Sequence, residues 1–185
     1  MRDTDVLVLD CLSILIIEDS ENMSTLLRAM LQAFGARRIS STLTADTSAD
    51  DLYHFRPDII IMDWYLNSLR ASEFMRKLRH KDNPHAGIPV IAITAETRKS
   101  VVIDALSFGV DNIMSKPLSA QSLYDRLLIL VTEDRKIIRI NDYVGPLTPA
   151  HRAMVAREIM DQVQRLASEE DGEYSDDTQS VTIAI

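Results

Sequence analysis

Short apolar runs alternate with amphipathic segments from residue 12 to about residue 131. Three runs, at residues 12–17, 58–62 and 88–94, are almost continuously apolar, which is typical of strands buried on both faces of a parallel sheet. Two more, at residues 39–44 and 112–114, are more polar or very short, and we expect them at the edges of that sheet. The pattern therefore predicts five strands.

A segment with helical periodicity follows each predicted strand. The best defined is residues 20–34, where apolar side chains recur every three or four positions and Gly35 supplies a stop. The other predicted helices are residues 47–55, 68–79, 98–108 and 119–131, the last capped by Ser119. This alternation predicts a doubly wound α/β domain, because right-handed crossovers place helices on both faces and ligands at the carboxyl ends of the strands.

The last third of the chain departs from the alternation. Residues 132–147 are predicted to be a charged, irregular connector without a sixth strand–helix unit. A helix is predicted from Thr148, its N-cap, with Pro149 in the first position, to about residue 167. We interpret its apolar stripe as a surface packed against the protein, with dimerisation as the alternative. The stripe consists of Met154, Val155, Ile159, Val163 and Leu166.

Negative charge is concentrated at the C-terminal end. The chain has 20 Lys and Arg against 28 Asp and Glu, a net charge of −8, and residues 169–185 hold six of the acids and no base. An acidic, Ser-rich composition predicts that residues 168–185 form a disordered tail. We therefore divide the chain into an N-terminal extension (1–11), the main domain (12–131), a connector with its helix (132–167) and this tail.

The composition also excludes several classes of function. Binding to nucleic acid is not expected, because phosphate contacts need clustered Lys and Arg, which the chain lacks. The longest apolar stretch, residues 6–17, is shorter than the roughly 20 residues that span a bilayer and lacks the flanks of a secretory signal. Cys11 is the single cysteine, which excludes an internal disulfide and a Cys-rich zinc site. We expect a cytoplasmic protein without a membrane partner.

Polar residues stand at the carboxyl ends of four predicted strands. They are Glu18, Asp19, Asp63, Thr94 and Lys116. Three carboxylates close together repel one another, and a divalent cation such as Mg²⁺, which prefers oxygen ligands, removes that repulsion. An arriving phosphoryl group would explain why Lys116 stands beside a metal site. Its ammonium can pair with one phosphoryl oxygen while Thr94 donates a hydrogen bond to another. A carboxylate can itself be the nucleophile in phosphoryl transfer.

Each of these residues also has a purely structural interpretation. Glu18 and Asp19 can stabilise the positive end of the following helix. Asp63 can be a turn residue, Thr94 a β-branched strand end and Lys116 a solvated charge. The functional interpretation is preferred because four such coincidences would have to fall at four strand ends.

In order and spacing, the five residues resemble the receiver domain of bacterial two-component response regulators, in its stand-alone, CheY-like form. The separations are 44 residues from Asp19 to Asp63, 31 more to Thr94 and 22 more to Lys116, which Pro117 follows. The resemblance covers residues 12–131. It implies a flavodoxin-like doubly wound (βα)5 parallel sheet of strand order 2-1-3-4-5, here with a C-terminal helical extension.

The resemblance also implies a role for each residue. Asp63 would accept a phosphoryl group from a histidine kinase or a histidine phosphotransfer protein, assisted by Lys116 and Thr94. Mg²⁺ would be held by Glu18, Asp19, Asp63 and the backbone carbonyl of Tyr65. The protein would be a signalling phosphoprotein of a phosphorelay rather than an enzyme, apart from its own Mg-dependent phosphorylation and dephosphorylation.

Three positions depart from the family pattern. After Asp63, Asn67 stands where Pro is common and Ala71 lies near a common Gly, and Ile113 replaces the aromatic residue of the family's switch. These departures motivate an alternative, a pseudo-receiver that binds its partner constitutively without phosphorylation. A haloacid-dehalogenase-like phosphatase is disfavoured, because Tyr65 stands where such enzymes have a second Asp.

Residues 132–185 are too short and too acidic for a typical DNA-binding output module. We therefore expect a downstream protein target, bound through the face formed by the predicted helix 98–108, strand 112–114 and helix 119–131. A homodimer through the same face or through the C-terminal helix is an open alternative.

Overall fold

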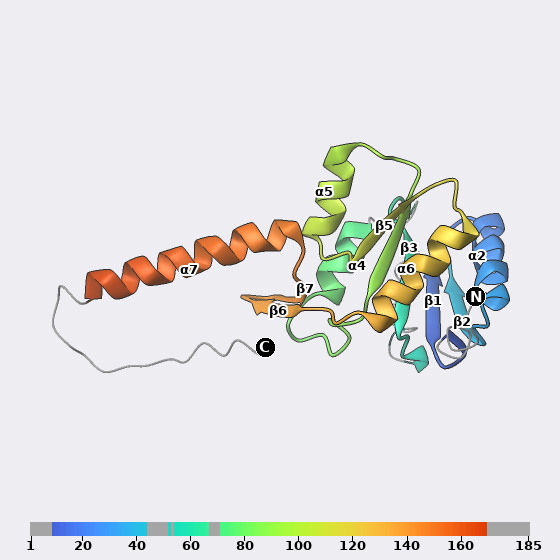
Figure 1. Ribbon diagram of the computed structural model, residues 1–185, viewed down its shortest axis with the longest axis horizontal. Helices are drawn as coiled ribbons and strands as arrows, with labels where there is room; N and C mark the ends of the chain where they lie inside the picture. The colour runs from blue at the N-terminus through green and yellow to red at the C-terminus, as the bar shows by residue number, and fades with distance from the viewer. Residues whose placement is uncertain (1–8, 44–51, 53, 67–70, 170–185) are drawn as a thin grey trace.

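The computed structural model describes residues 9–43, 52, 54–66 and 71–169, and its centre is a five-stranded parallel sheet (Figure 1). The strands are β1 (Ser13–Ile17), β2 (Arg38–Thr42), β3 (Ile59–Asp63), β4 (Val90–Thr94) and β5 (Asn112–Ser115). They lie in the order β2-β1-β3-β4-β5, and each neighbouring pair is parallel. The predicted fold, strand order and edge strands are confirmed.

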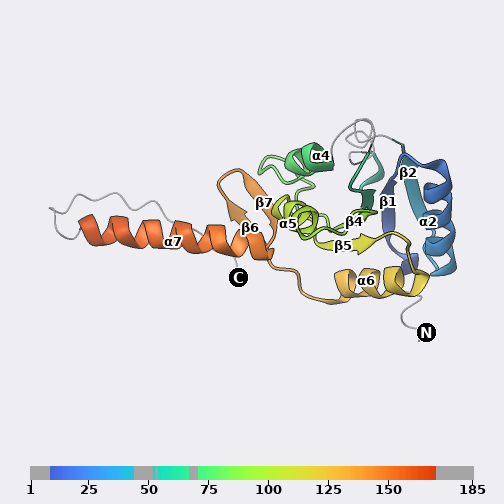
Figure 2. The ribbon, with the colours of Figure 1, turned by 90° about the horizontal axis from the view of Figure 1, so that it is seen from above.

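Helices cover both faces of the sheet. α2 (Glu21–Ala33) and α6 (Ala120–Thr132) pack on one face, and α4 (Ala71–Leu78) and α5 (Lys99–Ser107) pack on the other (Figure 2). α2 begins after Ser20, whose side chain accepts a hydrogen bond from Met23 N–H, and ends just before Gly35, which has a φ of 99°. The predicted helix at 47–55 and the start of the one at 68–79 lie largely outside the described residues.

Alternate side chains of β1 enter two separate cores. Ile14 and Ile16 belong to the core under α2 and α6, whereas Leu15 and Ile17 belong to the core under α4 and α5. Every residue of β1, β3 and β4 is buried, which explains why these runs are almost continuously apolar. Leu9, in the predicted N-terminal extension, is fully buried in the first core.

The connector contains a β-hairpin, so the prediction that it is irregular is wrong. β6 (Ile137–Ile140) pairs antiparallel with β7 (Tyr143–Pro146) in a sheet of their own. Asn141 opens the turn with a φ of 51°, a left-handed conformation that tight hairpin turns require and Asn tolerates. The charged residues around this short apolar strand obscured it in the sequence.

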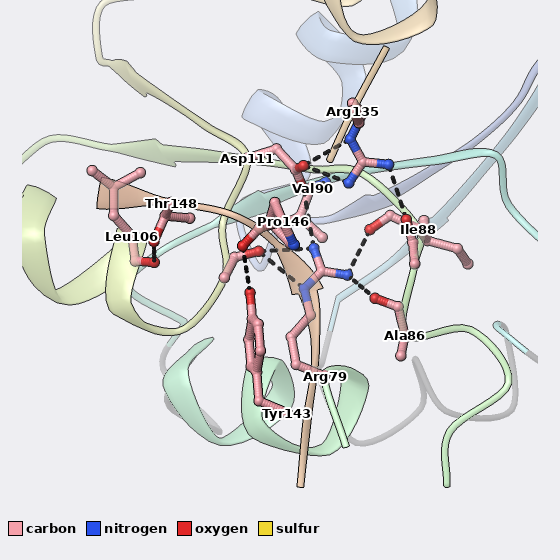
Figure 3. A network of polar contacts seen from close by, with 12 residues as sticks. Arg79, Ala86, Ile88, Val90, Leu106, Asp111, Arg135, Tyr143, Pro146 and Thr148 are labelled. Carbon is pink, nitrogen blue, oxygen red and sulfur yellow. Dashed lines mark hydrogen bonds and ion pairs between the residues drawn. The ribbon is translucent and has the colours of Figure 1, made fainter. Parts of the chain in front are cut away.

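An ionic cluster of buried Arg79 and Asp111 with partly buried Arg135 fastens the hairpin segment to the domain (Figure 3). Asp111 accepts hydrogen bonds from both arginines, and Arg79 also donates two to the carbonyl of Gly109, at 2.8 and 3.0 Å. In return, the N–H of Val144 in β7 donates to the Arg79 carbonyl at 2.8 Å. The C-terminal segment is therefore packed onto the domain through this Arg79 cluster.

The predicted start of the C-terminal helix is confirmed, because α7 (Pro149–Glu169) begins directly after Thr148. The Thr148 hydroxyl accepts a hydrogen bond from His151 N–H at 3.4 Å and donates one to the carbonyl of Leu106 in α5 at 3.0 Å. The first turn of α7 is thereby fixed to α5.

Beyond that turn, α7 projects away from the sheet (Figure 1). Met154 and Ile159 are 41% and 48% exposed, so the prediction that the apolar stripe packs against the protein is wrong for these two residues. The side chains of Val163 and Leu166, and the predicted tail from residue 170 onward, lie outside the described residues. Among the described helices, none is both long and apolar enough to cross a membrane.

Candidate functional site

The sheet brings the predicted site residues together at the carboxyl ends of its strands. Asp63 is the last residue of β3 and Thr94 the last of β4. Asp63 lies beside Ile93 of β4, and Thr94 lies beside Ser115, which precedes Lys116. Glu18 and Asp19 follow β1, the strand on the other side of β3.

Glu18, Asp19 and Asp63 form an acidic trio. Each offers a carboxylate oxygen, and these oxygens all lie within 4.8 Å of one another. Glu18 is 1% exposed and Asp63 7% exposed, so water screens their mutual repulsion poorly. Such a cluster is stable only when positive charge or hydrogen-bond donors are supplied nearby.

Backbone N–H groups supply some of these donors. Ser20 N–H donates to Glu18 Oε1 at 3.1 Å, and Tyr65 N–H donates to Asp63 Oδ1 at 3.0 Å. Both bonds come from the residue two positions later, so the loop after each strand orients the carboxylate at its end. The second oxygen of each carboxylate, Glu18 Oε2 and Asp63 Oδ2, contacts Lys116.

Lys116 supplies the positive charge. Its Nζ atom lies 2.7 Å from Asp63 Oδ2 and 3.2 Å from Glu18 Oε2. Its backbone N–H donates to the Thr94 carbonyl at 2.8 Å, which fixes the loop after β5 to the end of β4. A cis peptide bond joins Lys116 to Pro117.

The pKa values of the site reflect these contacts. Burial raises the pKa of Glu18, the Ser20 N–H opposes that shift, and the charge of Asp63 adds to it. Burial acts to lower the pKa of Lys116, but hydrogen bonds and charge attraction from Asp63 and Glu18 together outweigh it and raise that pKa. Lys116 is therefore an ammonium ion at neutral pH, aimed at Asp63.

Thr94 is buried at the site, but its hydroxyl is bonded to the following loop. Thr94 Oγ1 accepts from Glu96 N–H at 3.0 Å and donates to the Glu96 carbonyl at 3.3 Å. Glu96 is not among the residues predicted from the sequence, although a Thr hydroxyl commonly forms hydrogen bonds with the backbone two residues later. Ile113, the predicted switch position, is half-buried against the core under α4 and α5.

The two residues after Asp63 point in different directions. Trp64 is 7% exposed, belongs to the core under α4 and α5, and has its ring 6.2 Å from that of Phe108. Tyr65 is 51% exposed. Trp64 therefore serves the packing of the domain, whereas Tyr65 lies at the surface.

This arrangement suits both a hard cation and a phosphoryl group. The acidic trio offers oxygen ligands only, which is the donor set that Mg²⁺ takes. Lys116 stands beside it as a mobile point charge for an anion. The site can therefore hold a cation and an incoming phosphoryl group while it presents Asp63 as a nucleophile.

The chain is similar in sequence to known proteins. Residues 14–128, more than half of the chain, match the family model described as the response regulator receiver domain. The phosphate regulon transcriptional regulatory protein PhoB of Rhizobium meliloti is 32% identical over 114 residues, which are 62% of this chain and 49% of PhoB. The chemotaxis protein CheY1 of Helicobacter pylori (strain J99) is 29% identical over 131 residues, which are 66% of this chain and all of CheY1. The chain thus spans about half the length of PhoB.

Solved structures show the same fold. The signal receiver domain of a DNA-binding response regulator from Colwellia psychrerythraea has a TM-score of 0.60 at 26% identity, over 66% of this chain and 99% of that one. The receiver domain of the sensor histidine kinase PA1611 from Pseudomonas aeruginosa has a TM-score of 0.57 at 25% identity, over 64% and 95%. The latter structure has a magnesium ion coordinated in its active site cleft.

Proposed function

Because the chain belongs to the response regulator receiver family, we propose that Asp63 accepts a phosphoryl group from a histidine kinase or a histidine phosphotransfer protein. The observation that carries this proposal is the position of Lys116. Its ammonium lies 2.7 Å from Asp63 within the acidic trio, so one nucleophile, one cation and two further carboxylates meet at the carboxyl edge of the sheet.

In the proposed transfer, a carboxylate oxygen of Asp63 attacks the phosphorus atom of the donor's phosphohistidine. An O–P bond forms as the P–N bond breaks, the bonding pair returns to the imidazole nitrogen, and that nitrogen takes up a proton from water. Bound Mg²⁺ would neutralise charge on the phosphoryl oxygens. We assign its ligands to Glu18, Asp19, Asp63 and the backbone carbonyl of Tyr65, since the acidic trio is an all-oxygen donor set.

The other two residues act on the phosphoryl oxygens. Lys116 pairs with one of them once the carboxylate of Asp63 has become an acyl phosphate, and Glu18 at 3.2 Å keeps the ammonium in place during that exchange. Thr94 donates to another oxygen after its hydroxyl leaves the Glu96 carbonyl. The loop after β4 is then released from one of its two bonds to Thr94.

We further propose that the phosphorylated form binds a downstream protein in the cytoplasm, through the face formed by α5, β5 and α6. The motivation is that β5 leads into Lys116 and that the loop released by Thr94 leads into α5. We assign the phosphoryl chemistry to residues 12–131 and regard residues 132–167 as an appendage to it. In this proposal the protein is a signalling switch that turns over only its own phosphoryl group.

Intact-mass spectrometry after incubation with acetyl phosphate and Mg²⁺ tests the proposal. The expected result is a gain of one phosphoryl group, roughly 80 Da, that is labile at alkaline pH. The gain should disappear in Asp63→Asn and after metal chelation. It should persist in Asp104→Asn, a matched control on the exposed surface of α5.

Equal phosphorylation of Asp63→Asn and the wild type would place the acceptor elsewhere. No gain from either acetyl phosphate or a phosphorylated histidine phosphotransfer protein, in a protein that is folded, would refute phosphoryl transfer. That outcome would support the pseudo-receiver, a constitutive binding module with the same fold.

A further inference from the structure

The two long edges of the β6–β7 hairpin differ in their surroundings. The edge of β7 is covered, because Val144 N–H donates to the Arg79 carbonyl and Lys81 N–H donates to the Asp142 carbonyl. Tyr143 also forms an isolated bridge to His80 on this side. The hairpin is thus fastened to the domain by β7, and β6 is the outer strand.

The edge of β6 presents backbone groups from two residues. The Val144 N–H points out of the hairpin, to Arg79, so Val144 and its cross-strand neighbour Arg139 form a pair that exchanges no hydrogen bonds. The N–H and carbonyl of Arg139 therefore also point away from the hairpin. Ile137, two residues earlier, lies opposite Pro146 and also directs its N–H and carbonyl away from the hairpin. In the part of the chain that the structure describes, no hydrogen bond reaches these four groups.

This edge lacks most of the protection that isolated sheet edges carry. Exposed edge strands are normally short of apolar residues, covered, or interrupted by Pro or charge. Three of the four residues of β6 are Ile, Ile137 is 38% exposed, and Arg139 is the single charged residue in the strand. An open, apolar edge of this kind is a template for another strand.

We propose that β6 pairs with β6 of a second copy of this chain, antiparallel about a two-fold axis at Ile138. Residues directly opposite in an antiparallel ladder alternate between pairs that exchange two hydrogen bonds and pairs that exchange none. With Ile138 on the axis, Ile137 lies opposite Arg139 of the second copy, and Arg139 lies opposite its Ile137. All four outward groups of each strand are then satisfied, in four hydrogen bonds.

The side chains are self-complementary in the same register. Ile138 meets its own copy across the axis, and both are on the half-buried side of the hairpin. The stem of Arg139 covers the exposed Ile137 of the other strand. Lys136 lies opposite Ile140, so no two like charges face each other, which favours a second copy as the occupant.

The pairing is expected to be weak and independent of phosphorylation. A ladder of four hydrogen bonds with a few Ile contacts buries less than the roughly 1,600 Å² of a standard stable interface. We therefore expect a dissociation constant between about 10 μM and 1 mM. Asp63, at the far end of the sheet, takes no part, so Asp63→Asn should dimerise as the wild type does.

Sedimentation equilibrium across that concentration range tests the proposal. The average mass of the wild type should rise from 20.9 kDa toward twice that value. Arg139→Pro removes an outward N–H without touching a bond of the hairpin and should raise the dissociation constant at least tenfold. Arg139→Gln, which keeps the N–H but removes the charge, should change it by less than about threefold.

A charge exchange at the axis gives a second, independent test. Ile138→Glu and Ile138→Lys should each be monomeric, because like charges would meet across the axis, and an equimolar mixture should form a heterodimer. Retained protection of the Val144 N–H against hydrogen exchange shows that each variant keeps its hairpin docked.

Three results would overturn the proposal. They are a wild type that stays monomeric at about 1 mM, a dimer that Arg139→Pro leaves unchanged, and a mixture of the two docked Ile138 variants that fails to associate. Protection of the Ile137 and Arg139 N–H groups that does not vary with concentration would show instead that another segment of the same chain covers the edge.

Discussion

Removal of the Asp111 carboxylate should destabilise the protein more than removal of any exposed charged group. The Asp111 side chain is 4% exposed and the Arg79 side chain 2%. Asp111 accepts hydrogen bonds from Arg79, Arg135 and the N–H of Val90, the first residue of β4. In Asp111→Ala, both guanidinium groups lose this anion, and Arg79 has no access to water in exchange.

The magnitude follows from that burial. Burial lowers the pKa of Arg79 to about 10 even though Asp111 opposes the shift, so its charge is already costly to hold. Removal of one partner from a buried ion pair costs about 3–5 kcal/mol, a large share of the roughly 5–15 kcal/mol that a folded domain has in total. For a chain of this size the unfolding temperature should fall by about 6–20 °C.

Thermal and urea unfolding, followed by circular dichroism, measure this loss. Asp142→Ala is the matched control, because Asp142 forms an exposed pair with Lys81 at 2.7 Å in the same hairpin. Its midpoint should stay close to that of the wild type. Hydrogen exchange at the Val144 N–H should rise in Asp111→Ala alone, since that bond depends on the position of Arg79. Equal midpoints for the two variants would refute the reasoning.

Three further outcomes can be measured on single variants. Gly145→Ala should lower stability by about 1–3 kcal/mol in urea unfolding, because the new methyl group would lie 2.6 Å from Tyr143 Oη; Gly87→Ala, in open space, should not. Burial, aided by the charge of Arg79, lowers the pKa of His151. As the pH falls, the His151 imidazole is therefore protonated in the unfolded chain before it is protonated in the folded protein. Stability should therefore fall as the pH drops below about 6.5, and His151→Gln should flatten that fall in urea titrations between about pH 5 and pH 7.5. Lys116→Gln should slow phosphorylation by acetyl phosphate at least tenfold in time-resolved mass spectra, with the unfolding midpoint as a check on folding.

The three inner strands, β1, β3 and β4, were predictable because burial on both faces leaves a continuous apolar run in the sequence. A strand such as β3, all of whose residues are buried, has to be apolar throughout, and no tertiary contact changes that reading. β6 is also rich in Ile, but it has only four residues, one of them Arg139, and it lies between Lys136 and a polar turn. The hairpin docks onto the domain through Arg79, more than 50 residues earlier, and no local pattern reports a contact over that distance.

The candidate site was predictable for a related reason. Glu18, Asp63, Thr94 and Lys116 each stand directly after or at the end of a strand, so the parallel topology alone brings them together. The hydrogen bonds of the Thr94 hydroxyl with the Glu96 backbone were not predictable. They depend on the path of the loop to Glu96, and the sequence does not specify that path.

β4 and β5 carry different groups of residues at their two ends. Their carboxyl ends hold Thr94 and lead to Lys116, while their amino ends meet at Asp111, which accepts the N–H of Val90 and immediately precedes β5. The hairpin segment is thus fastened at the amino ends of β4 and β5, whose carboxyl ends hold Thr94 and lead to Lys116, two residues of the candidate site. The first turn of α7 is held to α5 through the bond from Thr148 to Leu106. Pairing through β6 would use a strand that contributes no residue to the acidic trio, so we expect dimerisation and phosphorylation to be separable by mutation.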